Sequence, residues 1–352
     1  MKKFWPGLMV GAALAAALAV VALWISLGAN YRGFQNQAFV LIERGAGSRA
    51  IAQALAQAGV IQHPWQFLAM RALTPSATLQ AGEYRFADAA SARVVFNRIA
   101  SGDVHRFPFT VPEGANIFDI AQALEAQGIL RGEEFLRAAA DPSLIRDLAP
   151  QAPTLEGYLF PSTYQLSRFL TAAELCRMMT REFRRQWSKL APAAASPATG
   201  AVHAAVTLAS LVEEETAVAA ERPLVASVFA NRLRRPMRLE CDPTVVYAAQ
   251  LEKRYTGAIR RSDLDRRSAY NTYQHDGLPP GPIANPGVAA LAAALHPAAT
   301  EFLFFVAKPQ GGSHVFSATL AAHEKAVRSY RHGSPSDSRA RKRAAPAPRK
   351  AG

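Results

Sequence analysis

A long run of apolar residues without charge is the first pattern along the chain. Residues 7–27 contain no Asp, Glu, Lys, Arg or His. A helix of this length, at about 1.5 Å per residue, spans the roughly 30 Å hydrocarbon core of a bilayer. Trp5 and Trp24 lie near its ends, where indole rings favour the membrane interface. The pattern predicts one transmembrane helix over residues 7–27.

The charges that flank this segment predict its orientation. Lys2 and Lys3 precede it, so the positive-inside rule keeps residues 1–6 in the cytoplasm and exports the rest. The alternative is a cleaved signal peptide, with the small residues at 26–29 as the cleavage site. Signal peptides have apolar cores of about 7–15 residues, so the length of this run favours an uncleaved anchor.

Two segments after the apolar run resemble one another. Residues 42–61 and 111–130 share a Gly-Ala pair, the run Ile-Ala-Gln-Ala-Leu and a later Gly. Each predicts a strand-like lead-in, a Gly-containing turn, a short amphipathic helix and a Gly that ends the helix. This loop-then-helix order resembles the glycan-binding LysM module. We therefore expect LysM-like α+β modules within residues 32–150, and a plain spacer is the alternative.

Longer helices interleaved with aromatic residues follow from about residue 155. Residues 268–287 carry four prolines and three glycines and predict an irregular loop. Helices are predicted at 171–190, 205–220, 221–233 and 318–330, with a hairpin formed by 302–306 and 314–317. Asp242 is predicted as the N-cap of a further helix, with Pro243 at its first position. The fold class is thus α+β, with a catalytic domain over residues 151–330.

The composition narrows the class of protein but does not indicate a function. The net charge is +13, with 40 Lys and Arg against 27 Asp and Glu, and residues 331–352 read as a disordered basic tail. Behind an export segment, such a tail favours solubility or attraction to anionic envelope polymers over nucleic acid. Cys176 and Cys241 are too few for a disulfide scaffold, and their pairing is left open.

Metal and nucleophile motifs are absent from the sequence. The eight His residues form no His-Glu-x-x-His, and the chain has no Cys-x-x-Cys, no Gly-x-Ser-x-Gly and no phosphate-binding loop. We therefore predict no metal and no cofactor. Carboxylate chemistry remains.

Three consecutive carboxylates, Glu213, Glu214 and Glu215, stand in the predicted helix 205–220. Glu215 falls on the apolar stripe with Leu211, Glu214 falls on the polar face, and Glu213 is intermediate. A carboxyl on the buried side of a helix is costly to ionise, so its pKa rises toward the range where it donates a proton near neutral pH. The alternative is a solvated acidic cluster.

A single carboxylic acid of this kind can cleave a glycosidic bond without water. It protonates the glycosidic oxygen and then, as the carboxylate, deprotonates a hydroxyl of the same sugar. A two-carboxylate hydrolase would need Asp242 as the second group, which its predicted capping role already explains. Neutral side chains of the 268–287 loop would position sugars, and Glu156 would line the groove; the loop residues are Asn271, Tyr273 and Gln274. A Pro-stiffened structural loop is the alternative.

Several motifs occur together and in order: LASLVEEET at 208–216, DPTVVY at 242–247, YNTY at 270–273 and GLPPGPIANPG at 277–287. With Leu-Glu-Gly at 155–157, they resemble the endolytic murein transglycosylase family (the MltG, or YceG-like, proteins) from the anchor to about residue 330. The second Glu of that family's Glu-x-Glu-Thr motif corresponds to Glu215. Cys241 is a departure, because the family more often has a small hydroxyl residue there.

The resemblance implies an inner-membrane, single-pass enzyme with a cytoplasmic N-terminus and a periplasmic catalytic body. It implies a lytic transglycosylase, a carbon–oxygen lyase that cuts the MurNAc-β-1,4-GlcNAc bond within nascent peptidoglycan strands and leaves a 1,6-anhydro-MurNAc end. Glu215 would be the general acid and base, and peptidoglycan synthases would be partners. Two rivals stay open: a hydrolytic muramidase that uses Asp242, and a non-catalytic peptidoglycan-binding scaffold.

Overall fold

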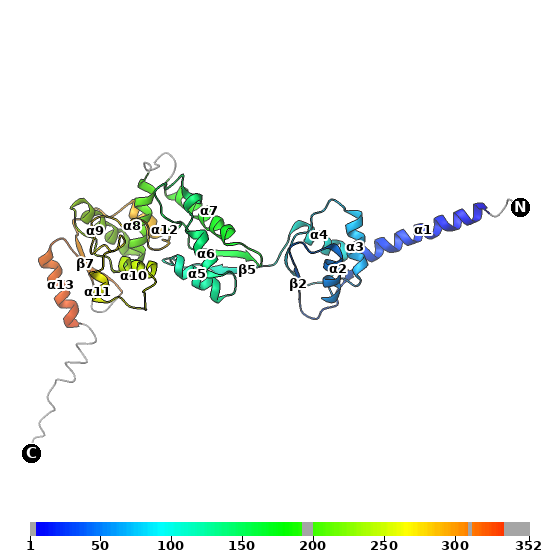
Figure 1. The fold of residues 1–352 in the computed structure, drawn as a ribbon, viewed down its shortest axis with the longest axis horizontal. Helices are drawn as coiled ribbons and strands as arrows, with labels where there is room; N and C mark the ends of the chain where they lie inside the picture. The colour runs from blue at the N-terminus through cyan, green and yellow to red at the C-terminus, as the bar shows by residue number, and fades with distance from the viewer. Residues whose placement is uncertain (1–4, 192–199, 309–311, 334–352) are drawn as a thin grey trace, which may run out of the picture. The chain divides into compact units, whose positions relative to one another are not determined.

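The computed structural model describes residues 5–191, 200–308 and 312–333, and the chain divides into two compact units (Figure 1). Unit 1 comprises Met1–Phe109 and Gln165–Leu170, and unit 2 comprises Thr110–Tyr164 and Thr171–Gly352. The sequence placed the boundary at 150/151, whereas the division falls between Phe109 and Thr110. Each unit combines helices with short antiparallel strands, in agreement with the α+β class.

Unit 1 begins with the apolar helix α1 (Trp5–Gly28). Within it, Met9–Gly28 is long and apolar enough to cross a membrane, with a mean hydropathy of 2.4 and only 6% of the stretch buried. Residues 1–4 of the expected cytoplasmic end lie outside the described part of the chain. The predicted apolar helix is therefore present, and strand β1 (Asn30–Tyr31) follows it almost at once.

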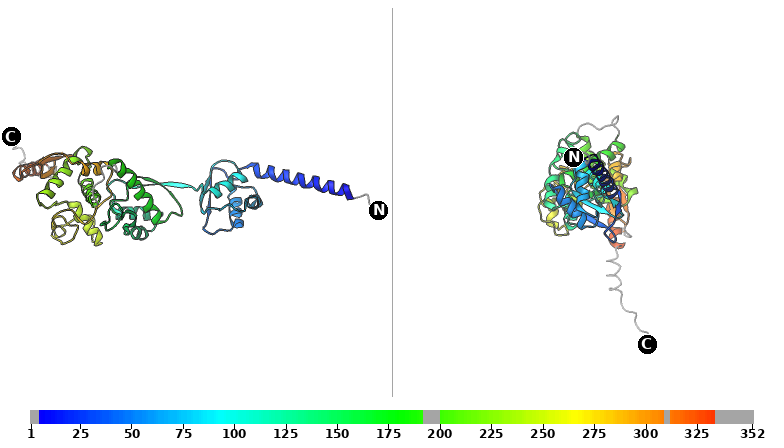
Figure 2. Two further views of the ribbon diagram at one scale, coloured as in Figure 1. Left: turned by 90° about the horizontal axis from the view of Figure 1, so that it is seen from above. Right: turned by 90° about the vertical axis from the view of Figure 1, so that its right-hand side faces the viewer.

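The body of unit 1 packs three amphipathic helices against short strand pairs (Figure 2). Its other elements are β2 (Ala38–Ile42), α2 (Ser48–Gln57), α3 (Pro64–Leu73), β3 (Gly82–Phe86), β4 (Ala90–Ser91) and α4 (Ala92–Ser101). β1 pairs with β4, and β2 with β3, both antiparallel. Alternate residues of β2 are buried, as expected for a strand with one face on a core, and Phe67, Tyr84 and Phe96 fill that core.

The sequence repeat is also a structural repeat. In the first copy, β2 leads through Gly45 (φ 80°) into α2, and Gly59 (φ 68°) follows the helix. In the second copy, β5 (Arg106–Thr110) leads through Gly114 (φ 82°) into α5 (Ile117–Ala126), and Gly128 (φ 64°) follows the helix. These left-handed conformations suit Gly, which has no Cβ.

The two copies of the repeat belong to different units. The turn of the second copy is fixed inside unit 2, because Gly114 N donates to Asn285 O at 3.0 Å and Asn285 N donates to Ala115 O at 3.1 Å. The second copy therefore packs with unit 2 rather than with the first copy, and the likeness of the two copies to LysM modules stays a prediction.

Unit 2 is mainly helical around α8 (Ala201–Glu215), which packs against α9, α10 and α12. The other elements are α6 (Gly132–Ala139), a 3-10 turn at Pro142–Ile145, α7 (Ala172–Leu190), a 3-10 turn at Ala219–Glu221, α9 (Arg222–Arg234), α10 (Asp242–Leu251), α11 (Arg261–Leu264), α12 (Val288–Leu295), β7 (Phe304–Ala307), β8 (His314–Ser317) and α13 (Leu320–Gly333). Strand β6 (Thr163–Ser167) begins in unit 2 and ends in unit 1. β5 pairs with β6, and β7 with β8 in the predicted hairpin. The loop over 268–287 is irregular, as predicted.

Three boundaries differ from the sequence expectation. The helix predicted at 205–220 spans Ala201–Glu215, and Thr216 after it is extended (φ −146°, ψ 126°). α10 begins at Asp242 with Cys241 as its N-cap, so Asp242 is not the cap. Residues 331–333 of the expected tail lie in α13, and 334–352 lie outside the described residues.

The N-terminus of α7 carries a capping box with a measurable contribution to stability. Thr171 Oγ1 accepts from Glu174 N at 3.3 Å, and Glu174 Oε2 accepts from Thr171 N at 2.8 Å. We expect Thr171→Ala to lower the free energy of unfolding by about 1 kcal/mol, measured by urea denaturation. Thr171→Ser retains the acceptor oxygen and should unfold like the parent. Equal stability of the Ala and Ser variants would contradict this role.

Candidate active site

The acidic cluster lies at the C-terminal end of α8, since the helix ends at Glu215. Residues 206–212 of this Ala- and Leu-rich helix are all buried. The end of a helix is the negative pole of its macrodipole, where a carboxylate is destabilised by about 0.3–1 kcal/mol. Three carboxylates at this pole do not stabilise the helix, so their environments have to be considered one by one.

The side chain of Glu213 is only 4% exposed. Its Oε1 lies 2.5 Å from Arg222 Nη2, and its Oε2 accepts from Gly287 N at 2.8 Å. The residue as a whole is intermediate in exposure, as expected, but its carboxyl forms an ion pair that ties α8 to α9 and a hydrogen bond that ties α8 to the end of the 268–287 loop.

Glu214 faces the turn of the second repeat. The residue is exposed, as expected, yet its carboxyl end lies against Gly114, where an added Cβ would be 2.6 Å from Oε1. Desolvation there, together with the charges of Asp119, Glu213 and Glu215, raises the pKa of Glu214 to about 7. The raised pKa of Glu214 could not be predicted from the helix pattern, because Gly114 and Asp119 lie about 100 residues earlier in the chain.

Glu215 faces the start of α10. Burial of its carboxyl is the main cause of a pKa above the ordinary value, and the nearby charge of Asp242 raises it further. The Cys241 thiol donates a hydrogen bond to this carboxyl, which lowers the pKa of Glu215. The charges of His314 and Arg232 lower it as well. Burial outweighs these, so Glu215 holds its proton at a higher pH than an exposed Glu does.

Tyr273 and Asp242 form a pair beside Glu215. Tyr273 Oη donates to Asp242 Oδ1 at 2.6 Å, and Arg238 Nη1 holds the Tyr273 carbonyl at 2.7 Å. Burial and the Asp242 carboxylate raise the pKa of Tyr273, and Glu215 contributes in the same direction. Asp242 is exposed and free of the capping role that the sequence assigned to it, so a carboxylate and a phenol share this region with Glu215.

The remaining loop residues organise the loop itself. Asn271 is 1% exposed, its Nδ2 donates to three backbone carbonyls between 263 and 266, and its Oδ1 accepts from Tyr273 N at 3.0 Å. Gln274 is partly exposed and donates to Leu264 O at 2.8 Å. Of the three loop residues named from the sequence, the structure brings Tyr273 beside Glu215.

Glu156 is 1% exposed and does not line an open groove. Its carboxyl accepts from Ile117 N at 3.0 Å, Tyr247 Oη at 3.0 Å and Asn285 Nδ2 at 2.8 Å. These donors favour the ionised form, but complete burial outweighs them and raises the pKa of Glu156 to about 8. Glu156 thus joins α5, α10 and the 268–287 loop from inside, and the expected contact with a sugar finds no support in this position.

Two residues near Glu215 were not found from the sequence. His314, at the start of β8, has its Nδ1 2.7 Å from Glu221 Oε2 and donates its backbone N–H to Glu221 Oε1 at 2.8 Å. Arg232, from α9, donates to Leu303 O at 2.7 Å and Leu239 O at 2.8 Å. The β7–β8 hairpin and α9 therefore both contribute residues near Glu215. The spacing of motifs in the sequence does not predict this proximity.

Metal and thiol chemistry receive no support from the described residues. Within the described ranges, no group of three or more His, Cys, Asp or Glu could hold a metal ion. Cys176 and Cys241 are both buried and both free thiols, and burial raises the pKa of each.

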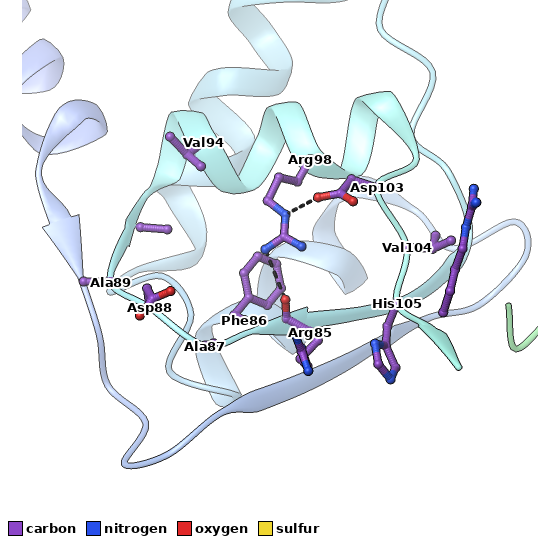
Figure 3. Close-up of a pocket in the computed structure, with 12 residues that line it drawn as sticks. Arg85, Phe86, Ala87, Asp88, Ala89, Val94, Arg98, Asp103, Val104 and His105 are labelled. Atoms are coloured by element: carbon purple, nitrogen blue, oxygen red, sulfur yellow. Dashed lines mark hydrogen bonds and ion pairs between the residues drawn. The ribbon is translucent and has the colours of Figure 1, made fainter. Parts of the chain in front are cut away.

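A groove of ≈ 440 Å³ lies in unit 1, between β3, α4 and the segment that leads into β5 (Figure 3). Its central charge is already satisfied: Arg98 donates to Asp103 Oδ2 at 2.8 Å and to Arg85 O at 3.1 Å, and it stacks 4.9 Å over Phe86. Residues of unit 1 alone line this groove, whereas Glu215 belongs to unit 2.

The chain belongs to the YceG-like family, whose model matches residues 40–329. This match covers both copies of the repeat and the whole candidate active site.

Curated relatives of this chain carry the name endolytic murein transglycosylase. The protein of Bacillus subtilis (strain 168) is 34% identical over 305 residues, which cover 82% of this chain and 83% of the relative. The protein of Streptococcus pneumoniae serotype 2 is 28% identical over 314 residues, 81% of this chain and 57% of the relative. A crystal structure of a putative yceG-like protein from Listeria monocytogenes is similar, with a TM-score of 0.53 and 30% identity, and covers 83% of this chain and 99% of that one.

Proposed function

We propose that this chain is an endolytic lytic transglycosylase of peptidoglycan that cuts the MurNAc-β-1,4-GlcNAc bond of nascent strands. Its membership of the YceG-like family and the names of its curated relatives support this class of enzyme. The observation that carries the mechanism is the raised pKa of the enclosed Glu215 carboxyl at the end of α8. No metal or cofactor takes part in the proposal.

The proposed reaction uses one carboxyl twice. Protonated Glu215 donates its proton to the 4-oxygen of the departing GlcNAc as the bond from that oxygen to C1 of MurNAc breaks. The Glu215 carboxylate then accepts the proton of the muramyl 6-hydroxyl, whose oxygen bonds to C1 and closes the 1,6-anhydro ring. Glu215 ends protonated, and no water is consumed.

The neighbours of Glu215 support this cycle. Asp242 raises the pKa of Glu215, which keeps a proton available on the carboxyl that donates it. Tyr273, which is held by Asp242 and Arg238, offers an aromatic ring for a sugar.

Mass spectrometry of the products released from intact sacculi tests the proposal. The transglycosylase gives muropeptides with an anhydro end, one water lighter than a reducing end. Muropeptides with reducing ends would show a hydrolytic muramidase instead. Binding to sacculi without soluble products would show a non-catalytic scaffold.

The substitution Asp242→Asn tests whether Asp242 only raises the pKa of Glu215 or is itself the second catalytic carboxylate. Removing the negative charge that raises the pKa of Glu215 should lower that pKa, so the alkaline limb of the pH–rate profile should move to lower pH while the products stay anhydro. Rates of anhydro product release across pH measure this. An unshifted limb would contradict the coupling, and loss of all activity at every pH would favour the two-carboxylate hydrolase.

We further propose that α1 anchors the enzyme in the inner membrane with residues 1–6 in the cytoplasm and the body in the periplasm. The length and hydropathy of Met9–Gly28 support a single span, and Lys2 and Lys3 support this orientation. A partnership with peptidoglycan synthases rests on the family resemblance alone.

A further inference from the structure

The last turn of α1 is part of the core of unit 1. Leu27 is 1% exposed and belongs to the core cluster, and Leu23, one turn earlier, packs against it. Gln66 Nε2 donates to Ser26 O at 3.1 Å and to Ser26 Oγ at 3.0 Å. Two residues after α1 the chain enters β1, where Asn30 pairs with Ser91. No flexible spacer therefore separates the apolar helix from the body of unit 1.

The length of the helix leaves no gap between a bilayer and unit 1. The 20 residues of Met9–Gly28 extend about 30 Å as a helix, which is about the thickness of the hydrocarbon core. This stretch includes the turn that packs into unit 1. If α1 spans a membrane, the surface of unit 1 around Ser26 and Leu27 is held against the lipid.

The side chains at this surface suit a membrane interface. Trp24 is 54% exposed, and the Arg93 guanidinium lies 4.5 Å from the centre of its ring. Trp65, which is 45% exposed, stands next to Gln66 on α3. Indole rings prefer the headgroup level, and an Arg beside them pairs with lipid phosphate. In Figure 1 α1 leaves unit 1 beside α3, and β2 lies on the opposite side of the unit.

We propose that unit 1 docks directly on the outer surface of the bilayer through Trp24, Trp65 and Arg93. Phospholipid is the partner of this surface, and unit 1 is a membrane-seated base rather than a module on a flexible tether. The inference rests on the proposed anchor. It also gives a structural reason against signal cleavage near residues 26–29, because cleavage would remove Leu27 from the core.

A depth measurement on the full chain tests the docking. Trp65→Cys carries a nitroxide label, and Phe39→Cys on β2 is the matched control, because Phe39 is aromatic and 46% exposed. The native Cys176 and Cys241 are buried, so labelling is directed to the new thiol. In nanodiscs of phosphatidylethanolamine and phosphatidylglycerol, electron paramagnetic resonance compares collisions with oxygen and with a water-soluble nickel complex. Arg93→Cys provides a second reporter if Trp65→Cys does not fold.

The ratio of oxygen to nickel collisions should be several-fold higher at position 65 than at position 39. Equal ratios in protein that co-purifies with the nanodiscs would overturn the docking and leave the anchor standing. Protein that does not remain with the nanodiscs would overturn the anchor, and the docking with it.

Discussion

Glu215→Gln is expected to lower the rate of anhydro-muropeptide release by about 10²–10⁴-fold, the usual contribution of general acid–base catalysis. The amide has nearly the shape of the carboxylic acid but can neither give up nor accept the proton that the cycle needs. Because the pKa of Glu215 is raised, the substitution removes no favourable negative charge from the fold. The variant should therefore unfold at the same urea concentration as the parent and still bind sacculi.

Glu214→Gln is the matched control, one residue earlier in the same helix. The pKa of Glu214, about 7, would also permit proton donation, but its carboxyl lies against Gly114 and not beside Asp242 and Tyr273. We expect Glu214→Gln to keep activity within a few-fold of the parent. If instead Glu214→Gln is inactive and Glu215→Gln active, the acid has been assigned to the wrong carboxyl.

Glu156→Ala is expected to cause the largest loss of stability, about 3–5 kcal/mol, because it leaves several buried donors without a partner. Ile117 N, Tyr247 Oη and Asn285 Nδ2 all lose their acceptor. Glu156→Gln keeps an acceptor oxygen and should lose less. Urea denaturation measures both, and an Ala variant as stable as the Gln variant would contradict the role of Glu156 as an internal tie.

The same residue predicts a pH dependence of stability. The pKa of Glu156 is about 8 in the folded chain, against the ordinary value of 4.5 for a Glu side chain, so between these values the folded state holds a proton that the unfolded state has released. Its contribution is fully present below about pH 4.5 and is lost as the pH rises through about 8. The stability of the parent relative to Glu156→Gln should fall over this window, and a constant difference would contradict the raised pKa.

The parts of the fold that depend on neighbouring residues were predictable. The helix over 171–190, the β7–β8 hairpin and the turn-and-helix repeat follow from apolar, strand and Gly patterns within short segments. The division between units was not predictable in this way. Asn285 fixes the turn at Gly114, and a contact between such distant residues leaves no mark on local composition.

The candidate active site also depends on contacts between distant residues, which could not be predicted from local patterns. The helical stripe singled out Glu215, but it did not show that α8 ends there or that Arg222 would draw Glu213 into the core. Asp242-Pro-Thr has the pattern of an N-cap followed by Pro. In the structure the Asp242 carboxylate accepts from Tyr273 Oη instead, so a tertiary hydrogen bond outweighs the local preference.

The titration of the Glu215 carboxyl tests the central claim most directly. Infrared difference spectra between the parent and Glu215→Gln, recorded across pH, isolate the C=O band of this one protonated side chain. We expect that band to persist above the pH at which an exposed Glu ionises, about 4.3, and to be absent from the variant. A Glu215 band that disappears at that ordinary pH would contradict the proposal that this carboxyl enters the reaction as the acid.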